Sequence, residues 1–139
     1  MKKEKSDGQR ALLLLIADDN RTARAGLRAL LESVARDGND FEIVEAEDGA
    51  QAVEIIAKRK PDLVLIDVQM PQLNGIEATR IIKARWPAIR VIVLTMYRTH
   101  QADALAAGAD TFLLKGSAPD RLLDAIFQEL YPPKEQNDE

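Results

Sequence analysis

The apolar run Asp62-Leu63-Val64-Leu65-Ile66-Asp67 is followed at once by the turn-forming residues 68–75, Val-Gln-Met-Pro-Gln-Leu-Asn-Gly. A continuous apolar run of this length is typical of a strand covered on both faces. Asp67 then lies at the carboxyl end of that strand, where a turn begins and solvent is reachable. Placing a carboxylate beside a core costs free energy unless the charge is paired. We therefore expect another group or an ion to hold Asp67.

Five apolar segments alternate with five amphipathic segments along the chain. We expect strands at residues 11–17, 41–46, 62–67, 90–95 and 110–114, of which three are nearly continuous apolar runs. Such runs predict a parallel sheet with helices on both faces. The sequence therefore predicts a doubly wound α/β fold built from five βα units.

The helices are predicted from apolar residues at helical spacing and from capping residues. Asn20 is expected to cap the first helix and Gly38 to stop it, Pro61 follows the second, and Trp86-Pro87 closes the third. The segment 117–120, Ser-Ala-Pro-Asp, resembles a capping box that opens the fifth. The predicted apolar positions are Leu27, Leu30, Leu31 and Val34 in the first helix, Val53, Ile56 and Ala57 in the second, Ala78, Ile81 and Ile82 in the third, Ala102, Leu105 and Ala106 on one side of a short fourth, and Leu122, Leu123, Ile126, Phe127 and Leu130 in the fifth.

The composition is typical of one globular domain. Of 139 residues, 46% are hydrophobic and 30% charged, and the lack of cysteine excludes disulfides and thiolate metal sites. A net charge of −4 argues against a general nucleic-acid-binding face, and no apolar run is long enough to span a bilayer. We expect a flexible segment at residues 1–10, a domain at 11–131, a disordered tail at 132–139, and a cytoplasmic location.

Polar residues follow four of the five predicted strands. Asp18 and Asp19 follow the first strand, Asp67 ends the third, Thr95 ends the fourth and Lys115 follows the fifth. Ligands of open α/β sheets bind at the carboxyl ends of the strands. Any one of these residues alone would be read as a solvated loop residue, but four strand ends together predict a site.

These residue types favour phosphoryl chemistry. Three converging carboxylates repel one another, so that either a pKa rises or a cation binds, and Mg²⁺ prefers such oxygen ligands. Lys115 supplies a cation for an anionic group, and Thr95 supplies a hydroxyl. A carboxylate nucleophile, Mg²⁺ and a cation are the parts needed to form an aspartyl phosphate. No cysteine is present and His100 is the only histidine, so no Ser/His or Cys/His pair competes.

Taken together, these motifs resemble the response-regulator receiver domain of two-component signalling, over about residues 11–130. The residues that carry the resemblance are Asp18-Asp19, Asp67 with Met70-Pro71 and Asn74-Gly75, Val91 to Thr95, and Gly108-Ala109-Asp110 before Lys115. The resemblance implies a flavodoxin-like fold with strand order 2-1-3-4-5. It also implies phosphoryl transfer from the histidine of a sensor kinase to Asp67.

The resemblance further implies a role for each matching residue. Mg²⁺ would be bound by Asp19, Asp67 and the carbonyl of Gln69, with Asp18 acting largely through water. Thr95 and Lys115 would contact the phosphoryl group, and Thr95 and Phe112 would be the switch residues. The alternative for Phe112 is a plain core aromatic. Gln69 and Tyr97 lie at positions that tune dephosphorylation in the family.

Two segments, Thr95-Met96-Tyr97 and Phe112-Leu113-Leu114-Lys115, look most like the NarL/FixJ (LuxR-type) subfamily, whose receivers are usually joined to a DNA-binding domain. The sequence departs from the family in having Gly116 where many members have a cis proline, and Asn74 where aspartate is common. Only twelve residues separate Thr95 from Gly108, which predicts a short or irregular fourth helix.

The leading hypothesis is a phosphorylation-gated receiver that catalyses its own phosphorylation and dephosphorylation. Its partners would be a sensor histidine kinase and either a downstream protein or a second copy, bound through the fourth helix, fifth strand and fifth helix, without direct nucleic-acid or membrane contact. The alternatives are the receiver fragment of a DNA-binding transcriptional regulator, a Mg²⁺-dependent phosphohydrolase of the haloacid-dehalogenase type, a pseudo-receiver that signals by contacts alone, and a nucleotide-binding domain. Gln69 stands where the phosphohydrolases have a second acid, and no glycine-rich loop follows the first strand.

Overall fold

The structure, a computed structural model, describes residues 11–35 and 41–133. Five parallel strands form one sheet in the order β2-β1-β3-β4-β5, which confirms the predicted flavodoxin-like topology. The segment 1–10, Gly38 and tail residues 134–139 lie outside the described residues. The strands are β1 (Leu12–Ala17), β2 (Phe41–Ala46), β3 (Leu63–Asp67), β4 (Arg90–Thr95) and β5 (Thr111–Leu114).

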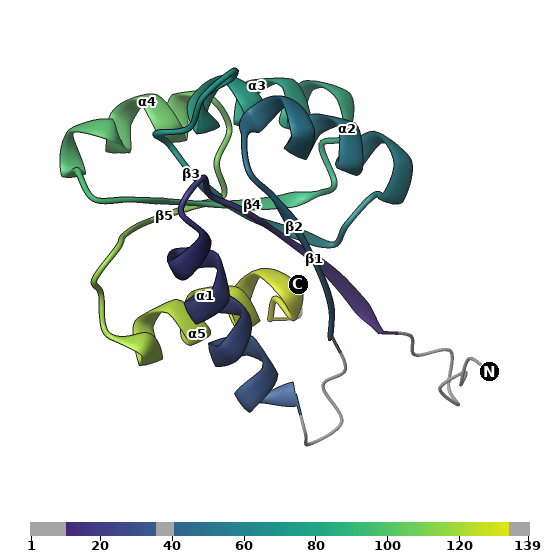
Figure 1. Ribbon diagram of the computed structural model, residues 1–139, viewed down its shortest axis with the longest axis vertical. Helices are drawn as coiled ribbons and strands as arrows, with labels where there is room; N and C mark the ends of the chain where they lie inside the picture. Colours follow the sequence, from purple (N-terminus) through teal and green to yellow (C-terminus); the bar gives the residue numbers. More distant parts are fainter. Residues whose placement is uncertain (1–10, 36–40, 134–139) are drawn as a thin grey trace, which may run out of the picture.

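Helices cover both faces of the sheet (Figure 1). One face carries α2 (Gly49–Arg59), α3 (Gly75–Arg85) and α4 (Gln101–Ala106). The other face carries α1 (Arg21–Ser33) and α5 (Pro119–Leu130). This three-layer arrangement explains why the central strands read as continuous apolar runs: both of their faces are buried.

Successive side chains of each central strand enter two different cores. Leu14 and Ile16 of β1 belong to the cluster that includes residues of α1 and α5. Leu15 and Ala17 belong to the cluster that includes residues of α2, α3 and α4. Because side chains alternate along a strand, a shift of one residue would exchange the two sets, so packing fixes the register.

Two predictions about helix ends need correction. Asn20 caps α1 as expected, its side chain accepting from the Ala23 amide at 2.9 Å. The helix was expected to run as far as Gly38, but it ends at Ser33, and Val34 is its C-cap. The predicted capping box of α5 is wrong. The Ser117 hydroxyl donates to the Leu114 carbonyl at 2.7 Å, and Ala118 is the N-cap, without a side-chain cap.

The fourth helix is short, as predicted. A 3-10 turn, η3 (Arg98–His100), leads into α4, which has six residues. Its buried residues are Ala104 and, just after it, Ala107, whereas Leu105 is 45% exposed. The side predicted to be apolar therefore faces solvent, because an apolar sequence pattern in so short a helix does not settle which side meets the sheet.

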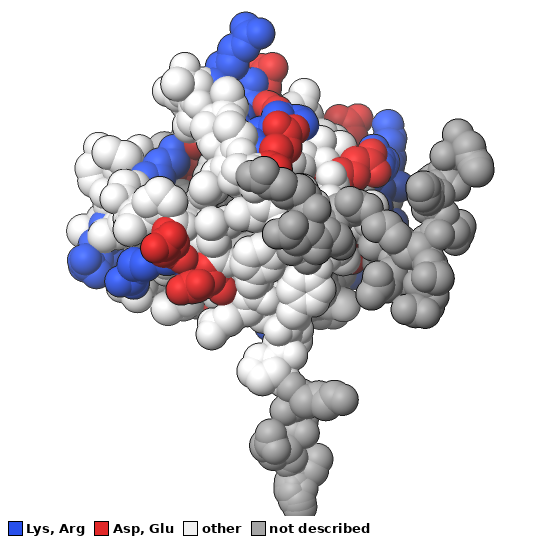
Figure 2. Space-filling view, turned by 90° about the horizontal axis from the view of Figure 1, so that it is seen from below, with Lys and Arg blue, Asp and Glu red and all other residues white. Residues whose placement is uncertain are grey.

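Figure 2 views the side of α1 and α5, where the visible acidic and basic side chains lie mostly toward the edges. Among the described residues, no helix has the length and apolar character needed to cross a lipid bilayer.

Candidate functional site

The strand register brings the predicted site residues to one edge of the sheet. Ala17 of β1 pairs with Ile66 of β3, so Asp18 and Asp67 come next in adjacent strands. Thr95 of β4 pairs with Leu114 of β5, the residue before Lys115. Four strand ends thus meet where the sequence predicted a site.

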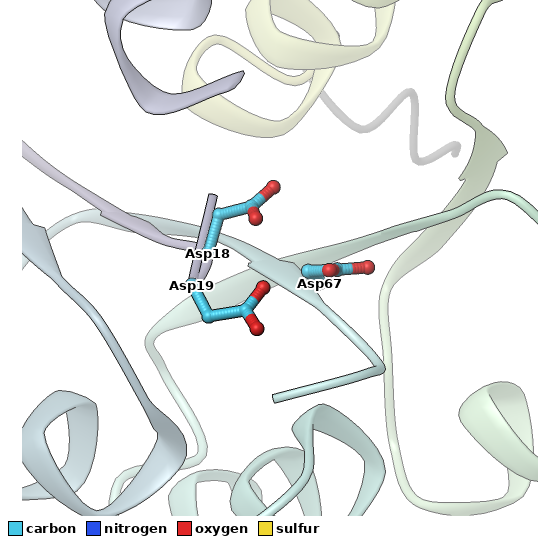
Figure 3. Close-up of side chains that lie close together, drawn as sticks. All are labelled: Asp18, Asp19 and Asp67. Carbon is cyan, nitrogen blue, oxygen red and sulfur yellow. The ribbon is translucent and has the colours of Figure 1, made fainter. Parts of the chain in front are cut away.

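Three carboxylates converge there (Figure 3). Asp18, Asp19 and Asp67 each offer a carboxylate oxygen, and these oxygens lie within 4.8 Å of one another. Asp18 and Asp67 are buried, whereas Asp19 is exposed. Hard oxygen donors with one side open to solvent suit Mg²⁺, which keeps several of its waters. The donor set therefore fits this metal.

Lys115 reaches two of the acids. Its Nζ lies 2.7 Å from Asp18 Oδ2 and 3.3 Å from Asp67 Oδ2. Burial lowers the pKa of Lys115, but the hydrogen bond to Asp18 and the charges of both carboxylates outweigh it, so that the pKa is raised. The amine is therefore held as a cation at the site.

The pKa of Asp67 is also raised. Burial is the main cause and the nearby charge of Asp18 adds to it, while Lys115 acts in the opposite direction. One lysine thus does not fully offset the cost of ionising this carboxyl group among its neighbours. A bound divalent cation would favour the ionised form, as expected for a metal site.

Thr95, Gln69 and Phe112 complete the set of predicted site residues. Thr95 is fully buried, and its hydroxyl oxygen accepts from the Tyr97 amide at 3.3 Å. Gln69 follows β3 with an exposed side chain. Phe112 is half-buried and packs against the core on the side of α2, α3 and α4. Thr95 ends β4 and Gln69 lies just after β3, whereas Phe112 is the second residue of β5. The structure does not test the roles predicted for them.

The turn after β3 holds the start of α3 against Asp67. The Gly75 amide donates to the Val68 carbonyl at 2.9 Å. The Asn74 side chain accepts from the amides of Ile76 and Glu77, each at 2.9 Å, which caps the helix. A Cβ on Gly75 would lie 2.0 Å from the Asp67 carbonyl oxygen, so only glycine fits here. Capping of α3 thus accounts for Asn74, and close packing against Asp67 accounts for Gly75.

Lys115 is carried by a turn without a cis bond. Gly116 has φ +91°, and the Ser117 amide donates to the Leu114 carbonyl at 3.1 Å. The Lys115 amide donates to the Thr95 carbonyl at 2.7 Å. A glycine in the left-handed region is a standard way to close such a turn. The expectation that this loop does without a cis proline is confirmed.

Sequence reasoning missed one buried charge beside the site. Arg24 of α1 is only 8% exposed, and its Nη1 donates to the Asp18 carbonyl at 2.6 Å. A signal was present, because Arg24 precedes Leu27 and Leu31 by three and seven residues and therefore shares their face of the helix. A charged residue on an apolar helix face is expected to be paired, so the pattern predicts a partner for Arg24.

Comparison with known proteins identifies the same family. The profile described as "Response regulator receiver domain" matches residues 14–127. The chain is 36% identical over 116 residues to the transcriptional regulatory protein DegU of Brevibacillus brevis, covering 81% of this chain and 48% of that protein. It is 36% identical over 118 residues to chemotaxis protein CheY of Listeria monocytogenes, covering 83% and 95%. The chain thus spans about half the length of the regulators that it matches first.

Solved structures agree. A LuxR-family two-component response regulator from Aurantimonas sp. superposes with a TM-score of 0.78 at 32% identity, covering 87% of this chain and 86% of that one. The receiver domain of the sensor histidine kinase PA1611 from Pseudomonas aeruginosa, described with a magnesium ion in its active-site cleft, superposes with a TM-score of 0.76 at 25% identity, covering 87% and 98%.

Receiver domains of this family act as phosphoacceptors, bind Mg²⁺ at an acidic pocket, and work with histidine kinases and output domains. Sequence profile, strand order and acidic pocket all lead to the same family. The chain belongs to the response regulator receiver domain family.

Proposed function

We propose that this chain accepts a phosphoryl group on Asp67 from a phosphohistidine of a sensor kinase and thereby switches its binding surface. One observation carries the proposal: Asp67 is a buried carboxyl group at a strand end, within 4.8 Å of two further acids and 3.3 Å from Lys115. Burial raises the pKa of Asp67, so keeping this carboxyl group ionised costs free energy. A chemical role explains such an acid better than a contribution to stability does.

The proposed transfer uses Asp67 as the nucleophile. A carboxylate oxygen forms a bond to phosphorus while the bond from phosphorus to the donor nitrogen breaks, and the bonding pair returns to that nitrogen. Lys115 Nζ and the Thr95 hydroxyl are proposed to donate to the phosphoryl oxygens and offset their charge. The later hydrolysis transfers the group to water and frees Asp67.

Asp18, Asp19, Asp67 and the carbonyl of Gln69 are the proposed protein ligands of Mg²⁺, with Asp18 acting largely through water. When bound, the ion would neutralise charge on the carboxylates and on the phosphoryl oxygens. The clustering of three acids around one lysine supports this assignment.

Phosphorylation can be tested without knowing the kinase. The protein is incubated with Mg²⁺ and acetyl phosphate, and its intact mass is measured. We expect one phosphoryl adduct on the wild type and none on Asp67→Asn or after chelation of the metal. Lack of an adduct on the wild type, or the same adduct on Asp67→Asn, would refute the proposal.

A phosphohydrolase is the competing function. It would require turnover of a phosphate ester, with a second acid two residues after Asp67, where this chain has the exposed Gln69. Steady release of phosphate from an ester over many turnovers would revive it. A single stoichiometric adduct instead supports the receiver.

The output surface is proposed to lie on α4, β5 and α5, and to bind a downstream protein or a second copy. Large exposed apolar side chains support this choice near α4: Met96, Tyr97 and Leu105 are 63%, 51% and 45% exposed. Phe112 of β5 and Thr95 are the proposed switch residues between the site and this surface. A cytoplasmic location, where the kinase would supply the phosphoryl group, belongs to the same proposal.

Beryllofluoride, which imitates a phosphoryl group, allows the output to be tested by small-angle scattering. We expect the complex to change its oligomeric state or its affinity for a partner, and Leu105→Ser to abolish the change while still binding beryllofluoride. Identical scattering and partner binding with and without beryllofluoride would contradict this assignment.

A further inference from the structure

The structure holds Asp18 at four points. Its amide donates to the Ala46 carbonyl of β2 at 3.1 Å, and its carbonyl accepts from Arg24 at 2.6 Å. One carboxylate oxygen accepts from the Asn20 amide at 2.9 Å and the other from Lys115 at 2.7 Å. Three of these partners come from the backbone or from the proposed phosphoryl-binding lysine. Arg24 is the one that no role described above explains.

Arg24 is itself held in place by Glu45. Its Nε donates to Glu45 Oε1 at 2.7 Å, and the other oxygen of Glu45 accepts from Arg28 Nε at 2.8 Å. Hydrogen bonds from Arg28 and Arg24 lower the pKa of Glu45, so that this carboxylate stays charged. The planar guanidinium thus spans from β2 to the backbone of Asp18, with two donors used in fixed directions.

Stability alone is a weak reason for this arrangement. Burying an ion pair costs desolvation that its attraction often only balances, and apolar residues of similar size can do as well. The position lies on the apolar face of α1, where leucine would pack against the core. What leucine could not supply is a donor that fixes the Asp18 carbonyl, and with it the loop that carries Asp18 and Asp19.

We propose that Arg24, oriented by Glu45, is a positioning residue that sets the affinity of the acidic site for its divalent cation. It does not touch the ion or the phosphoryl group. It fixes the main chain of Asp18 so that two carboxylates are directed toward Asp67 before the ion arrives. This inference rests on the proposed Mg²⁺ site.

Arg28 provides a matched control. It lies one turn along α1, pairs with the same Glu45, and makes its other contacts to the Ile43 carbonyl at 3.1 Å and to Glu32 at 3.5 Å, away from Asp18. Arg24→Gln and Arg28→Gln each remove one cation from Glu45. Only the first removes the hydrogen bond to the Asp18 carbonyl.

The affinity is measured with Mn²⁺ as the probe, from the electron paramagnetic resonance signal of the free ion during titration. We expect Arg24→Gln to raise the Kd by about tenfold, the lower end of the range for groups behind metal ligands. Arg28→Gln should leave the Kd unchanged, Glu45→Gln should raise it less, and Arg24→Lys, with a single donor group, should restore part of the affinity. Circular dichroism and thermal unfolding establish which variants are folded.

Each outcome is decisive. If folded Arg24→Gln binds Mn²⁺ as the wild type does, or if Arg28→Gln weakens binding equally, the positioning role is wrong. If Arg24→Gln does not fold, Arg24→Lys decides: a Kd equal to that of the wild type overturns the proposal, and a raised Kd supports it. If the wild type binds no Mn²⁺ at all, the metal site itself is refuted, which is a different result from loss of binding in the Arg24 variants alone.

Discussion

Gly75 offers a direct test of how closely α3 packs against the proposed phosphorylation site. A methyl group added there would meet the Asp67 carbonyl oxygen at 2.0 Å and its carbonyl carbon at 2.8 Å. Both are backbone atoms of a central strand, so no side chain can rotate away. The start of α3 would have to move, at the expense of the 2.9 Å hydrogen bond from Gly75 to Val68.

The expected cost follows from these contacts. Overpacking by one methyl group costs about 1–3 kcal/mol, and a backbone obstacle belongs at the upper end. Alanine recovers about 0.5–1 kcal/mol over glycine in a helix. Gly75→Ala should therefore lower the free energy of unfolding by about 2 kcal/mol. It should also slow phosphorylation by acetyl phosphate, because the displaced contact is with Asp67 itself.

Gly26→Ala is the matched control. Gly26 also lies in a helix, α1, but a Cβ there would find nothing within 4 Å. This variant should gain about 0.5–1 kcal/mol. Urea unfolding followed by circular dichroism measures both free energies. If Gly75→Ala proves as stable as Gly26→Ala, the close contact between α3 and Asp67 is wrong.

Three further changes test charge and capping. Lys115→Met leaves two buried carboxylates without their cation and should lower the free energy of unfolding by about 2 kcal/mol. Thermal unfolding should show that Mg²⁺ stabilises this variant more than the wild type. Equal stabilisation would contradict the pairing of Lys115 with Asp18 and Asp67. Because burial raises the pKa of Asp67, the folded state keeps this proton to higher pH than the unfolded chain. Metal-free stability should thus fall as the pH rises from the ordinary aspartyl pKa of 3.8 toward the raised pKa of the folded state. Asp67→Asn should lose this decline and unfold at higher temperature at neutral pH. A wild-type stability curve that rises over this range, after subtraction of the variant's curve, would refute the raised pKa. Ala118→Ser supplies the side-chain cap that α5 lacks and should add about 1 kcal/mol in urea unfolding, whereas no gain would mean that Ala118 is not the N-cap.

The residues themselves were sufficient for the parallel α/β architecture and for bringing the three acids and the lysine to one edge of the sheet, whereas the strand order came from the family resemblance. Continuous apolar runs identified the parallel strands, because both faces of such a sheet are buried. Asp18, Asp19, Asp67 and Lys115 could be assigned to one place because parallel strands end at the same edge. Local capping by Asn20 was also readable, since it involves residues only three positions apart.

Other features depended on contacts between distant segments. The sequence pattern did not tell which side of α4 meets the sheet, and Leu105 proved to face solvent. Ser117 has the right type to cap α5, yet it donates to the Leu114 carbonyl because the preceding turn directs it there. The contact of Arg24 with Asp18 and Glu45 joins α1, β2 and the loop after β1.

Periodicity and strand polarity are local properties of the chain, so the sequence could predict which elements form and which strand ends bring the three acids and Lys115 together. How the acids are held depends on the tertiary structure. The packing of α3 against the Asp67 carbonyl, which leaves no room for a Cβ at Gly75, and the buried guanidinium behind Asp18 arise where separate elements pack together. Such contacts depend on how the elements pack in three dimensions, and the spacing of residues along the sequence does not specify them.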